Sequence, residues 1–143
     1  MSVEENLQTI KDGYEAFNAH DWDRFLERYA ESVVYSAPDL PEPLKGVEAF
    51  RELIQTYNTA FPDQRFEEVR TFGQGDWAVS EAVFTGTNKG PFPGPEGQTI
   101  PATNKQVRNR AVYVFKFEGG KVTELRGYAD QLGLMAQLGL APE

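Results

Sequence analysis

The chain of 143 residues contains no cysteine and a single histidine. Without cysteine it has no disulfide framework, no thiolate nucleophile and no cysteine-bound zinc or iron–sulfur cluster. One histidine cannot build a histidine-based metal centre, which leaves only carboxylate sites for hard cations. We therefore expect no metal and no cofactor. Any chemistry then has to come from Asp, Glu, Arg, Lys, Tyr, Ser or Thr.

Positive charge is also scarce, since 14 Lys and Arg face 22 Asp and Glu, giving a net charge of −8. Such a chain repels a phosphate backbone, so we expect no nucleic-acid partner. No apolar run approaches the roughly 20 residues of a membrane span, and the opening MSVEENLQTI is not typical of a signal peptide. At roughly 150 residues per domain, we expect one cytoplasmic domain over residues 1–143, with no membrane partner.

Apolar residues at helical spacing predict three helices in the N-terminal half of the chain. The first covers residues 3–17, and the second, which Asp21 can cap, covers residues 22–29. The third begins after Gly46 and ends before Pro62, because a proline disfavours helical backbone in the residue before it.

The rest of the chain favours strands. The expected strands cover residues 32–37, 66–72, 77–87, 106–117 and 122–130. A long Gly/Pro loop over residues 87–104 is of the kind that often covers a site, and the apolar tail after residue 130 predicts a short helix or cap. The fold class is therefore α+β. We expect a cone in which three N-terminal helices pack on a strongly bent antiparallel β-sheet and enclose a pocket.

Five segments of the chain resemble one known family. They are YEAFNAHDWDRFLERYAESVVY, GVEAF at the start of the third helix, FPD after it, PATNK, and GGKVTELRGYADQLGLMAQLGL near the C-terminus. Together they resemble the SnoaL-like polyketide cyclase and ester cyclase branch of the NTF2-like superfamily, over nearly the whole chain. The resemblance implies an enzyme without a cofactor, in which the strand-terminal Asp130 is the catalytic acid and base. It also implies a homodimer that buries the open face of the sheet.

Several positions depart from the family patterns. Asn88 stands where the ester cyclases commonly have histidine, and Arg126 where they often have tryptophan. The steroid-isomerase type of the same cone places its base where this chain has Ala37, and the limonene-epoxide-hydrolase type needs a second carboxylate where it has Asn109. In PATNK, Asn104 replaces the usual glycine, a mild change because asparagine tolerates left-handed backbone. The fold assignment stands, and the substrate class stays open.

Asp130 is the first candidate catalytic residue. Side chains alternate along a strand, so Arg126, Tyr128 and Asp130 share one face of the last strand. If that face is turned to the pocket, its apolar surroundings suit a carboxylate for proton transfer near neutrality. On spacing alone, a plainer interpretation is favoured, in which Asp130 pairs with Arg126 or caps the helix that follows. The family resemblance reverses that order.

Further candidates come from arginine and tyrosine. Arg110, on the neighbouring strand, could hold a carboxylate or enolate oxygen through paired N–H donors. Tyrosines are informative because a buried phenol needs a hydrogen-bond partner, and we predict Tyr14 as the third catalytic residue. The predicted substrate-binding residues are Tyr35, Tyr57, Trp77, Glu81, Arg126 and Tyr128.

These residues favour a cyclase or lyase that closes a ring, by an aldol-type step, in a small apolar carbonyl compound such as a polyketide-like ester. Asp130 would remove a proton next to one carbonyl, Arg110 or a tyrosine would stabilise the enolate, and the enolate would attack a second carbonyl. One alternative is a non-catalytic small-molecule-binding protein. Another is an isomerase or hydrolase, which would need a second acid such as Glu81. We expect the homodimer to use the outward strand residues Val107, Phe115 and Phe117.

Overall fold

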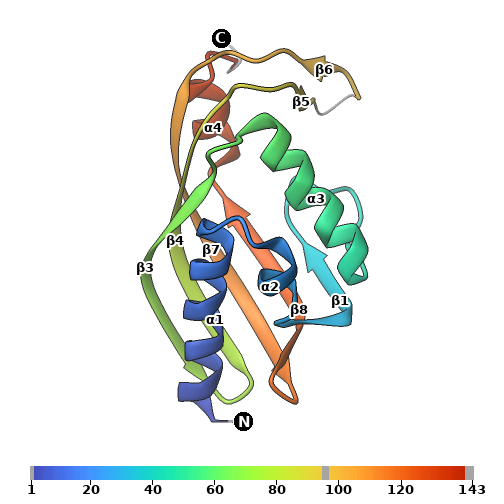
Figure 1. Ribbon diagram of the computed structural model, residues 1–143, viewed down its shortest axis with the longest axis vertical. Helices are drawn as coiled ribbons and strands as arrows, with labels where there is room; N and C mark the ends of the chain where they lie inside the picture. The colour runs from blue at the N-terminus through green and yellow to red at the C-terminus, as the bar shows by residue number, and fades with distance from the viewer. Residues whose placement is uncertain (1, 95–96, 141–143) are drawn as a thin grey trace.

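The computed structural model describes residues 2–94 and 97–140. Its helices are α1 (Val3–Asn18), α2 (Trp22–Leu26), α3 (Val47–Ala60) and α4 (Gln131–Gln137). The three N-terminal helices and the short helix in the tail confirm the prediction. All three N-terminal helices lie over one face of the sheet, while α4 lies near its far end (Figure 1). No helix of the described residues is long and apolar enough to cross a membrane.

The strands form one large sheet and a small hairpin. They are β1 (Tyr29–Ser36), β2 (Leu44–Lys45), β3 (Arg65–Gln74), β4 (Trp77–Thr87), β5 (Phe92–Pro93), β6 (Thr99–Ile100), β7 (Gln106–Glu118) and β8 (Lys121–Ala129). The large sheet has the order β2-β1-β8-β7-β4-β3. Its pairs are antiparallel except for β1 and β8, which run parallel, so the sheet is mixed rather than purely antiparallel as predicted.

Hydrogen bonds at both ends of α1 fix its position. Ser2 caps the N-terminus in a capping box with Glu5. At the other end the Asn18 amide donates to the Phe66 carbonyl and accepts from the Phe66 N–H, each over 2.8 Å. These two bonds join the end of α1 to the start of β3 and leave a space between the helices and the curved sheet.

The main core lies between the helices and the inner face of the sheet. Phe115 and Phe117 are buried in it, and Val107 is buried in a second cluster with Phe61 and Leu134, which corrects the prediction that the three face outward. Residues 107, 109 and 111 point inward on β7, and the exposed residues 108, 110 and 112 point outward. Because these side chains fill the core, a dimer would have to use other side chains.

The loop over residues 87–104 packs on the end of α3 instead of covering the pocket. Asn88 is buried, donates to the carbonyls of Ala60 and Gly90, and accepts from the backbone and hydroxyl of Thr103. Asn104 has a φ of 61°, the left-handed conformation that its place in PATNK predicts. Asn88 therefore ties both ends of this loop to α3.

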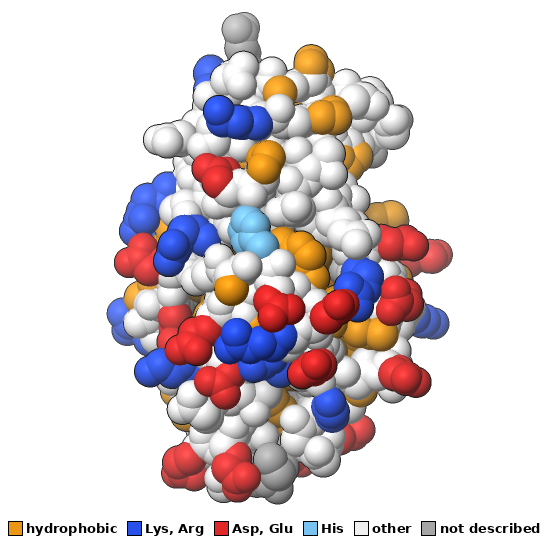
Figure 2. All heavy atoms as spheres, in the orientation of Figure 1, with side chains coloured by type: hydrophobic (Ala, Val, Ile, Leu, Met, Phe, Trp, Pro, Cys, Tyr) orange, Lys and Arg blue, Asp and Glu red, His pale blue; other side chains and the backbone are white. Residues whose placement is uncertain are grey.

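Acidic side chains lie across the helical face of the molecule, where lysines and arginines are interspersed among them (Figure 2). Arg51 of α3, for example, pairs with Asp23 of α2 over 2.9 Å and with Glu48 over 3.5 Å. These are exposed pairs that contribute little to stability. The excess negative charge is thus a property of the solvated surface.

Candidate functional site

A largely apolar cavity of about 160 Å³ lies between the helices and the inner face of the sheet. Its walls come from α1, α3, α4, β1, β7 and β8, together with the segment that follows β1. Among the residues that form it are Ile10, Tyr14, Phe17, Tyr35, Asp39, Phe50, Ile54, Tyr57, Asn109, Ala111, Tyr113, Phe115, Leu125, Gly127, Ala129, Gln131 and Leu134. None of the described residues of the loop 87–104 is among the residues that line it.

Six tyrosines border this cavity, and Tyr29 and Tyr128 are two of them. The other four are Tyr14 of α1, Tyr35 of β1, Tyr57 of α3 and Tyr113 of β7. Burial raises the pKa of Tyr14 to about 12, although the hydrogen bond between Tyr14 and Ser80 lowers it in part. Burial likewise raises the pKa of Tyr57 to about 12 and, with less effect, so does the charge of Asp39. The pKa values of Tyr35 and Tyr113 are raised for the same principal reason, their burial. All four phenols are therefore neutral near pH 7 and can act as hydrogen-bonding groups, not as bases.

Four of the predicted residues border the pocket: Tyr14, Tyr35, Tyr57 and, in a more exposed position, Tyr128. Tyr14 projects from α1, and its hydroxyl lies 2.5 Å from the Ser80 hydroxyl on β4. Tyr35 comes from β1, and its ring stacks on Phe50 of α3 with centroids 5.2 Å apart. The structure brings these tyrosines together because α1, β1 and α3 all converge on the same cavity.

Asn109 borders the pocket and was not predicted as a site residue. It is 5% exposed, and among the described residues its side-chain amide has no hydrogen-bond partner. The amide faces the pocket, and its atoms are not among the fully buried polar atoms that lack a partner. A bound ligand can therefore form hydrogen bonds with the Asn109 amide. A sequence signal existed: a single polar residue stands between Val107 and Ala111 on the apolar side of a strand.

The mouth of the pocket carries a carboxylate, that of Asp39 in the segment after β1. Its charge raises the pKa values of Tyr35 and Tyr57, although burial contributes more to both shifts. Gln131, the first residue of α4, also borders the pocket and hydrogen-bonds with Tyr57. Asp39 follows Pro38 directly in a proline-rich segment. This segment has no helical or strand periodicity, so the sequence does not predict which way the Asp39 side chain points.

Asp130 lies at the rim of the pocket rather than in its wall. It is exposed, and its carboxylate accepts a hydrogen bond of 2.8 Å from the backbone N–H of Gly133. It is therefore the N-cap of α4, as the plainer interpretation of the sequence has it. Its chain neighbours Ala129 and Gln131 both line the pocket. No ion pair joins Asp130 to Arg126, which instead binds Glu124 over 2.7 Å.

The structure places four predicted residues on the outer face of the sheet, away from the pocket. Arg110 and Arg126 are exposed there, Glu81 pairs with Arg70 over 3.0 Å, and Trp77 is exposed. Tyr128 borders the pocket, but it is 48% exposed. Side chains alternate between the two faces of a strand. On β8 the inward residues are Leu125, Gly127 and Ala129, so the residues between them face outward.

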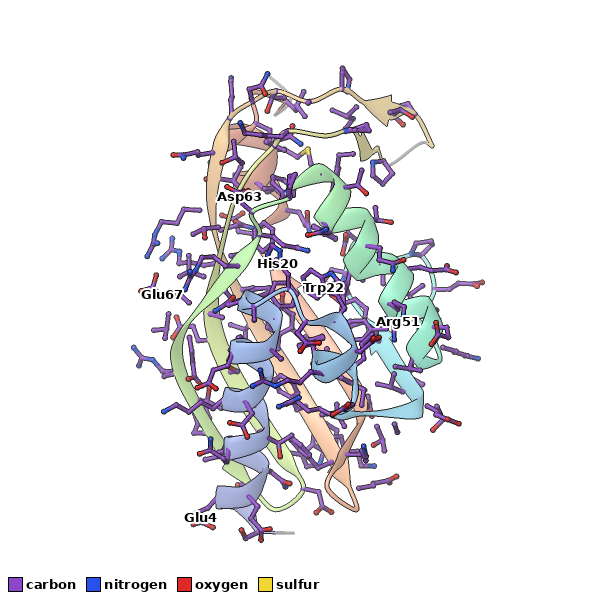
Figure 3. The ribbon with its side chains drawn as sticks, viewed as in Figure 1. Glu4, His20, Trp22, Arg51, Asp63 and Glu67 are labelled. Carbon is purple, nitrogen blue, oxygen red and sulfur yellow. The ribbon has the colours of Figure 1, made fainter. Side chains whose placement is uncertain are left out.

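The single histidine has a structural role, as expected. His20 lies between α1 and α2 beside Trp22, and the two rings stack with centroids 5.0 Å apart (Figure 3). Its Nε2 lies 2.8 Å from the Gln64 carbonyl. Within residues 2–94 and 97–140, no group of three or more His, Asp or Glu side chains could hold a metal ion.

Taken together, the cavity can bind a compact apolar compound and contact its oxygen atoms through phenols and an amide. Neutral donors that point into an apolar space stabilise a negative oxygen more strongly than donors in water do. The exposed Asp39 is part of the lining, and Asp130 lies between the lining residues Ala129 and Gln131. This arrangement suits proton transfer at carbon next to a carbonyl group.

Comparison with known proteins gives matches over most of the chain. The family model of the SnoaL-like polyketide cyclase matches residues 8–138. The chain is 27% identical to the aklanonic acid methyl ester cyclase DnrD of Streptomyces peucetius over 135 residues, which is 93% of this chain and 90% of that protein. It is 28% identical to the nogalonic acid methyl ester cyclase of Streptomyces nogalater over 95 residues, 66% of this chain and 67% of that protein.

A solved structure is similar in fold. It is a protein from Jannaschia sp. CCS1 that is described as a SnoaL-like polyketide cyclase, with a TM-score of 0.85 and 23% sequence identity over 98% of this chain and 94% of that one. Identity this low supports the shared fold alone. The α+β cone predicted from the sequence is thereby confirmed.

Proposed function

The chain belongs to the SnoaL-like polyketide cyclase family, and from this membership we propose that it closes a carbon ring in a small polyketide-type ester. The single observation that carries the proposal is the apolar cavity into which phenols and the free amide of Asn109 project. The two relatives named as methyl ester cyclases support an ester as the substrate class.

The size of the cavity indicates how much of the substrate is buried. Its volume is about 160 Å³, close to that of an engineered cavity of about 150 Å³ that takes up benzene. One six-membered ring fits that space. We infer that the ring being closed lies inside and that the remainder of the ester extends past Asp39 at the mouth.

In the proposed reaction, Asp130 removes a proton from the carbon next to one carbonyl group. The carbanion so formed attacks a second carbonyl carbon of the same molecule, which forms the new C–C bond and turns that carbonyl into an alkoxide. Asp130 then returns its proton to the alkoxide. No electron is gained or lost overall, so this step requires no redox cofactor. Asn109 and the phenols supply the oxygen contacts that the sequence assigned to Arg110.

Asp130 has to turn toward the pocket for this chemistry. Its carboxylate is held by the N–H of Gly133, and rotation of the side chain gives up this cap at a cost of about 1 kcal/mol. The positions of Ala129 and Gln131 in the pocket wall support the proposal, because they leave the Asp130 backbone next to the cavity. Catalytic hydrogen bonds often form only once a substrate is bound.

The test compares Asp130→Asn with Asp39→Asn, two equivalent changes at the same pocket mouth. Aklanonic and nogalonic acid methyl esters and simpler β-keto esters are the trial substrates. We expect Asp130→Asn to lower kcat by about 100-fold or more and Asp39→Asn to leave it nearly unchanged. Full turnover by Asp130→Asn would overturn the mechanism, and a loss confined to Asp39→Asn would assign the base to Asp39.

A non-catalytic binding protein is the second candidate, and the exposed, capping position of Asp130 favours it. Under that function the wild-type protein binds the esters without converting them. Equilibrium binding and product analysis on the same samples separate the two functions, since only the cyclase yields the cyclised product.

We also propose that the protein is a homodimer that associates through the outer face of the sheet. Large apolar side chains of β3, β4, β7 and β8 are exposed on this face, and a patch of that kind marks an interaction surface. They are Val69, Phe72, Trp77, Val112 and Tyr128. The ion pairs Arg70–Glu81 and Arg126–Glu124 lie among them, so the face carries little net charge and a second copy would not be repelled.

A further inference from the structure

A chain of hydroxyl groups leads from the pocket to the surface of the protein. The hydroxyl of Tyr14, in the pocket wall, lies 2.5 Å from that of Ser80, and Ser80 lies 2.8 Å from the hydroxyl of Thr71. Thr71 donates in turn to the carboxylate of Glu68. Ser80 is fully buried, so the chain crosses the interior between α1 and the sheet without a break.

A β-bulge makes the last link possible. Glu68 and Thr71 are three residues apart on β3, and in a regular strand they would face opposite sides of the sheet. The register with β4 shifts between Glu68 and Arg70, which leaves Val69 as the extra residue. The bulge turns Glu68 to the same side as Thr71. Bulges occur often beside active sites for this reason.

The outer end of the chain is open to water. Glu68 and Thr71 line a shallow groove between α1 and β3, and Glu68 can exchange its proton with solvent there. The other charged residues of the groove are Glu4, Lys11 and Arg70. Glu4 lies in the first turn of α1 (Figure 3). Tyr14 stands at the inner end, so the chain joins two separate hollows of the molecule.

The ionised Glu68 carboxylate fixes the direction of every hydroxyl in the chain. A carboxylate only accepts hydrogen bonds, so the single hydroxyl proton of Thr71 is donated to Glu68. Ser80 must then donate to Thr71, and Tyr14 must donate to Ser80. The oxygen of Tyr14 is left with its lone pairs toward the pocket. It is therefore an acceptor, ready for a hydroxyl proton of a bound ligand.

We propose that Tyr14, Ser80, Thr71 and Glu68 form a proton relay through which Glu68 takes a proton from a hydroxyl group of the ligand bound at Tyr14. In the step, the ligand O–H bond breaks and Tyr14 gains that proton, while its own proton passes to Ser80. Ser80 passes its proton to Thr71, and Thr71 passes its proton to Glu68. Four O–H bonds break and four form, and one negative charge moves from Glu68 to the ligand oxygen.

The relay deepens the proposed function, on which it rests, by naming the substrate more closely. Only an acidic hydroxyl can lose its proton to a carboxylate at a modest cost, so the ligand at Tyr14 is an enol or a phenol. Asp130 would act on a C–H bond of the substrate and the relay on an O–H bond of the same molecule. The reverse sequence returns the proton from Glu68 when the product leaves.

The test uses two matched probes and no substrate. 4-Nitrophenol is an acidic phenol whose absorption band reports its own ionisation, and 4-nitroanisole is its methyl ether, which has no proton to give. At a pH near the pKa of 4-nitrophenol, where burial alone would keep the bound probe neutral, we expect the wild-type protein to bind part of the probe as the phenolate. We also expect binding about tenfold tighter than for 4-nitroanisole, because a charge-assisted hydrogen bond forms.

Two variants interrupt the relay and one serves as control. Ser80→Ala and Glu68→Gln should remove the phenolate band and bring the affinity ratio of the two probes to about one. Glu67→Gln, which changes the adjacent outward carboxylate on β3 (Figure 3), should behave as wild type.

Unchanged affinity for 4-nitroanisole shows that the pocket of each variant is intact. A phenolate band that persists in Ser80→Ala and Glu68→Gln, or a wild-type protein that binds neither probe, would overturn the relay. The result does not depend on whether the esters are cyclised.

Discussion

The hydroxyl of Tyr35 lies against the backbone of Gly127, so close that a methyl group on residue 127 would come within 2.7 Å of the phenol oxygen. The same methyl group would lie 3.0 Å from the ring of Tyr113. Glycine in the interior of a strand often marks such a close approach. Gly127 therefore sets where two of the pocket phenols, those of Tyr35 and Tyr113, lie, although it carries no functional group.

Replacing Gly127 with alanine is expected to displace Tyr35 and to destabilise the protein by about 1–3 kcal/mol through overpacking. Tyr35→Phe removes the oxygen that collides, so the double variant should recover much of the loss. Urea unfolding of the two single variants and the double variant measures this coupling. Additive effects, with no recovery in the double variant, would show that the contact is not what constrains residue 127.

Replacing Asn109 with leucine is expected to separate stability from binding. The amide borders the pocket and is not one of the fully buried unpaired groups, so an apolar side chain of similar size should leave the free energy of unfolding nearly unchanged or raise it. The same change should weaken binding of a carbonyl ligand about tenfold, because a hydrogen bond to its oxygen is lost. Thermal unfolding and ligand titration of the same samples check both parts. A clearly destabilised variant with normal binding would mean that Asn109 is structural.

The order of the helices and strands could be predicted from the sequence. Apolar residues at helical spacing and helix-ending prolines are local signals that tertiary packing does not change. The orientation of the last strand could not be predicted in this way. Arg126 and Tyr128 lie on the exposed side of β8, since the small and apolar residues Leu125 and Gly127 face the core. Asp130 does not continue this alternation, because β8 ends at Ala129 and Asp130 caps α4.

Other features depend on contacts that no local pattern contains. The parallel pairing of β1 with β8 joins segments about ninety residues apart in the chain, such as Tyr35 and Leu125. The link between Glu68 and Thr71 exists only because Val69 forms a bulge. The predicted tyrosines Tyr14 and Tyr35 lie in the pocket because burial of aromatic rings is a strong tendency that does not need exact register.

Charge introduced into the outer apolar patch is expected to separate the proposed dimer. Val112→Arg places an unpaired guanidinium at the centre of this face, where a second copy would have to desolvate it. Analytical ultracentrifugation should show the wild type as a dimer and the variant as a monomer. Leu132→Glu is the control, because Leu132 is an exposed apolar residue of α4 and lies outside this sheet face. A wild type that sediments as a monomer at micromolar concentration contradicts the dimer.

The stability of the protein should depend on pH through Asp63, which lies in the turn between α3 and β3 (Figure 3). Burial alone raises the pKa of this carboxyl, but hydrogen bonds from the N–H and hydroxyl of Thr87, over 2.7 and 2.8 Å, outweigh it and lower the pKa overall. A lowered pKa in the folded state stabilises the protein above the unfolded value of about 3.9, and the effect is lost as the pH falls below it.

The comparison is between the wild type and Asp63→Asn in urea unfolding from pH 3 to 7. The wild-type advantage should be at most about 1 kcal/mol above pH ~5, since the carboxylate is mostly exposed. It should shrink toward zero near pH ~3. Thr87→Val, which keeps the carboxylate and removes the hydroxyl donor, should show a smaller pH-dependent part. A difference that is constant across this range would assign the effect to something other than ionisation of Asp63.

Asn88, which stands where related cyclases often have histidine, is expected to act through the loop and not through chemistry. Its amide makes four hydrogen bonds, to Ala60, Gly90 and Thr103, and it does not border the pocket. Asn88→Ala leaves these buried groups without partners and should lower the free energy of unfolding by about 1–3 kcal/mol. Among properly folded molecules, 4-nitroanisole should still bind with wild-type affinity, because the walls of the cavity are unchanged.

Asn88→His provides the contrast, since an imidazole can replace only part of this hydrogen bonding and should give an intermediate loss of stability. If instead Asn88→His raised turnover of the methyl esters while stability fell, position 88 would belong to the catalytic site despite its distance from the pocket wall.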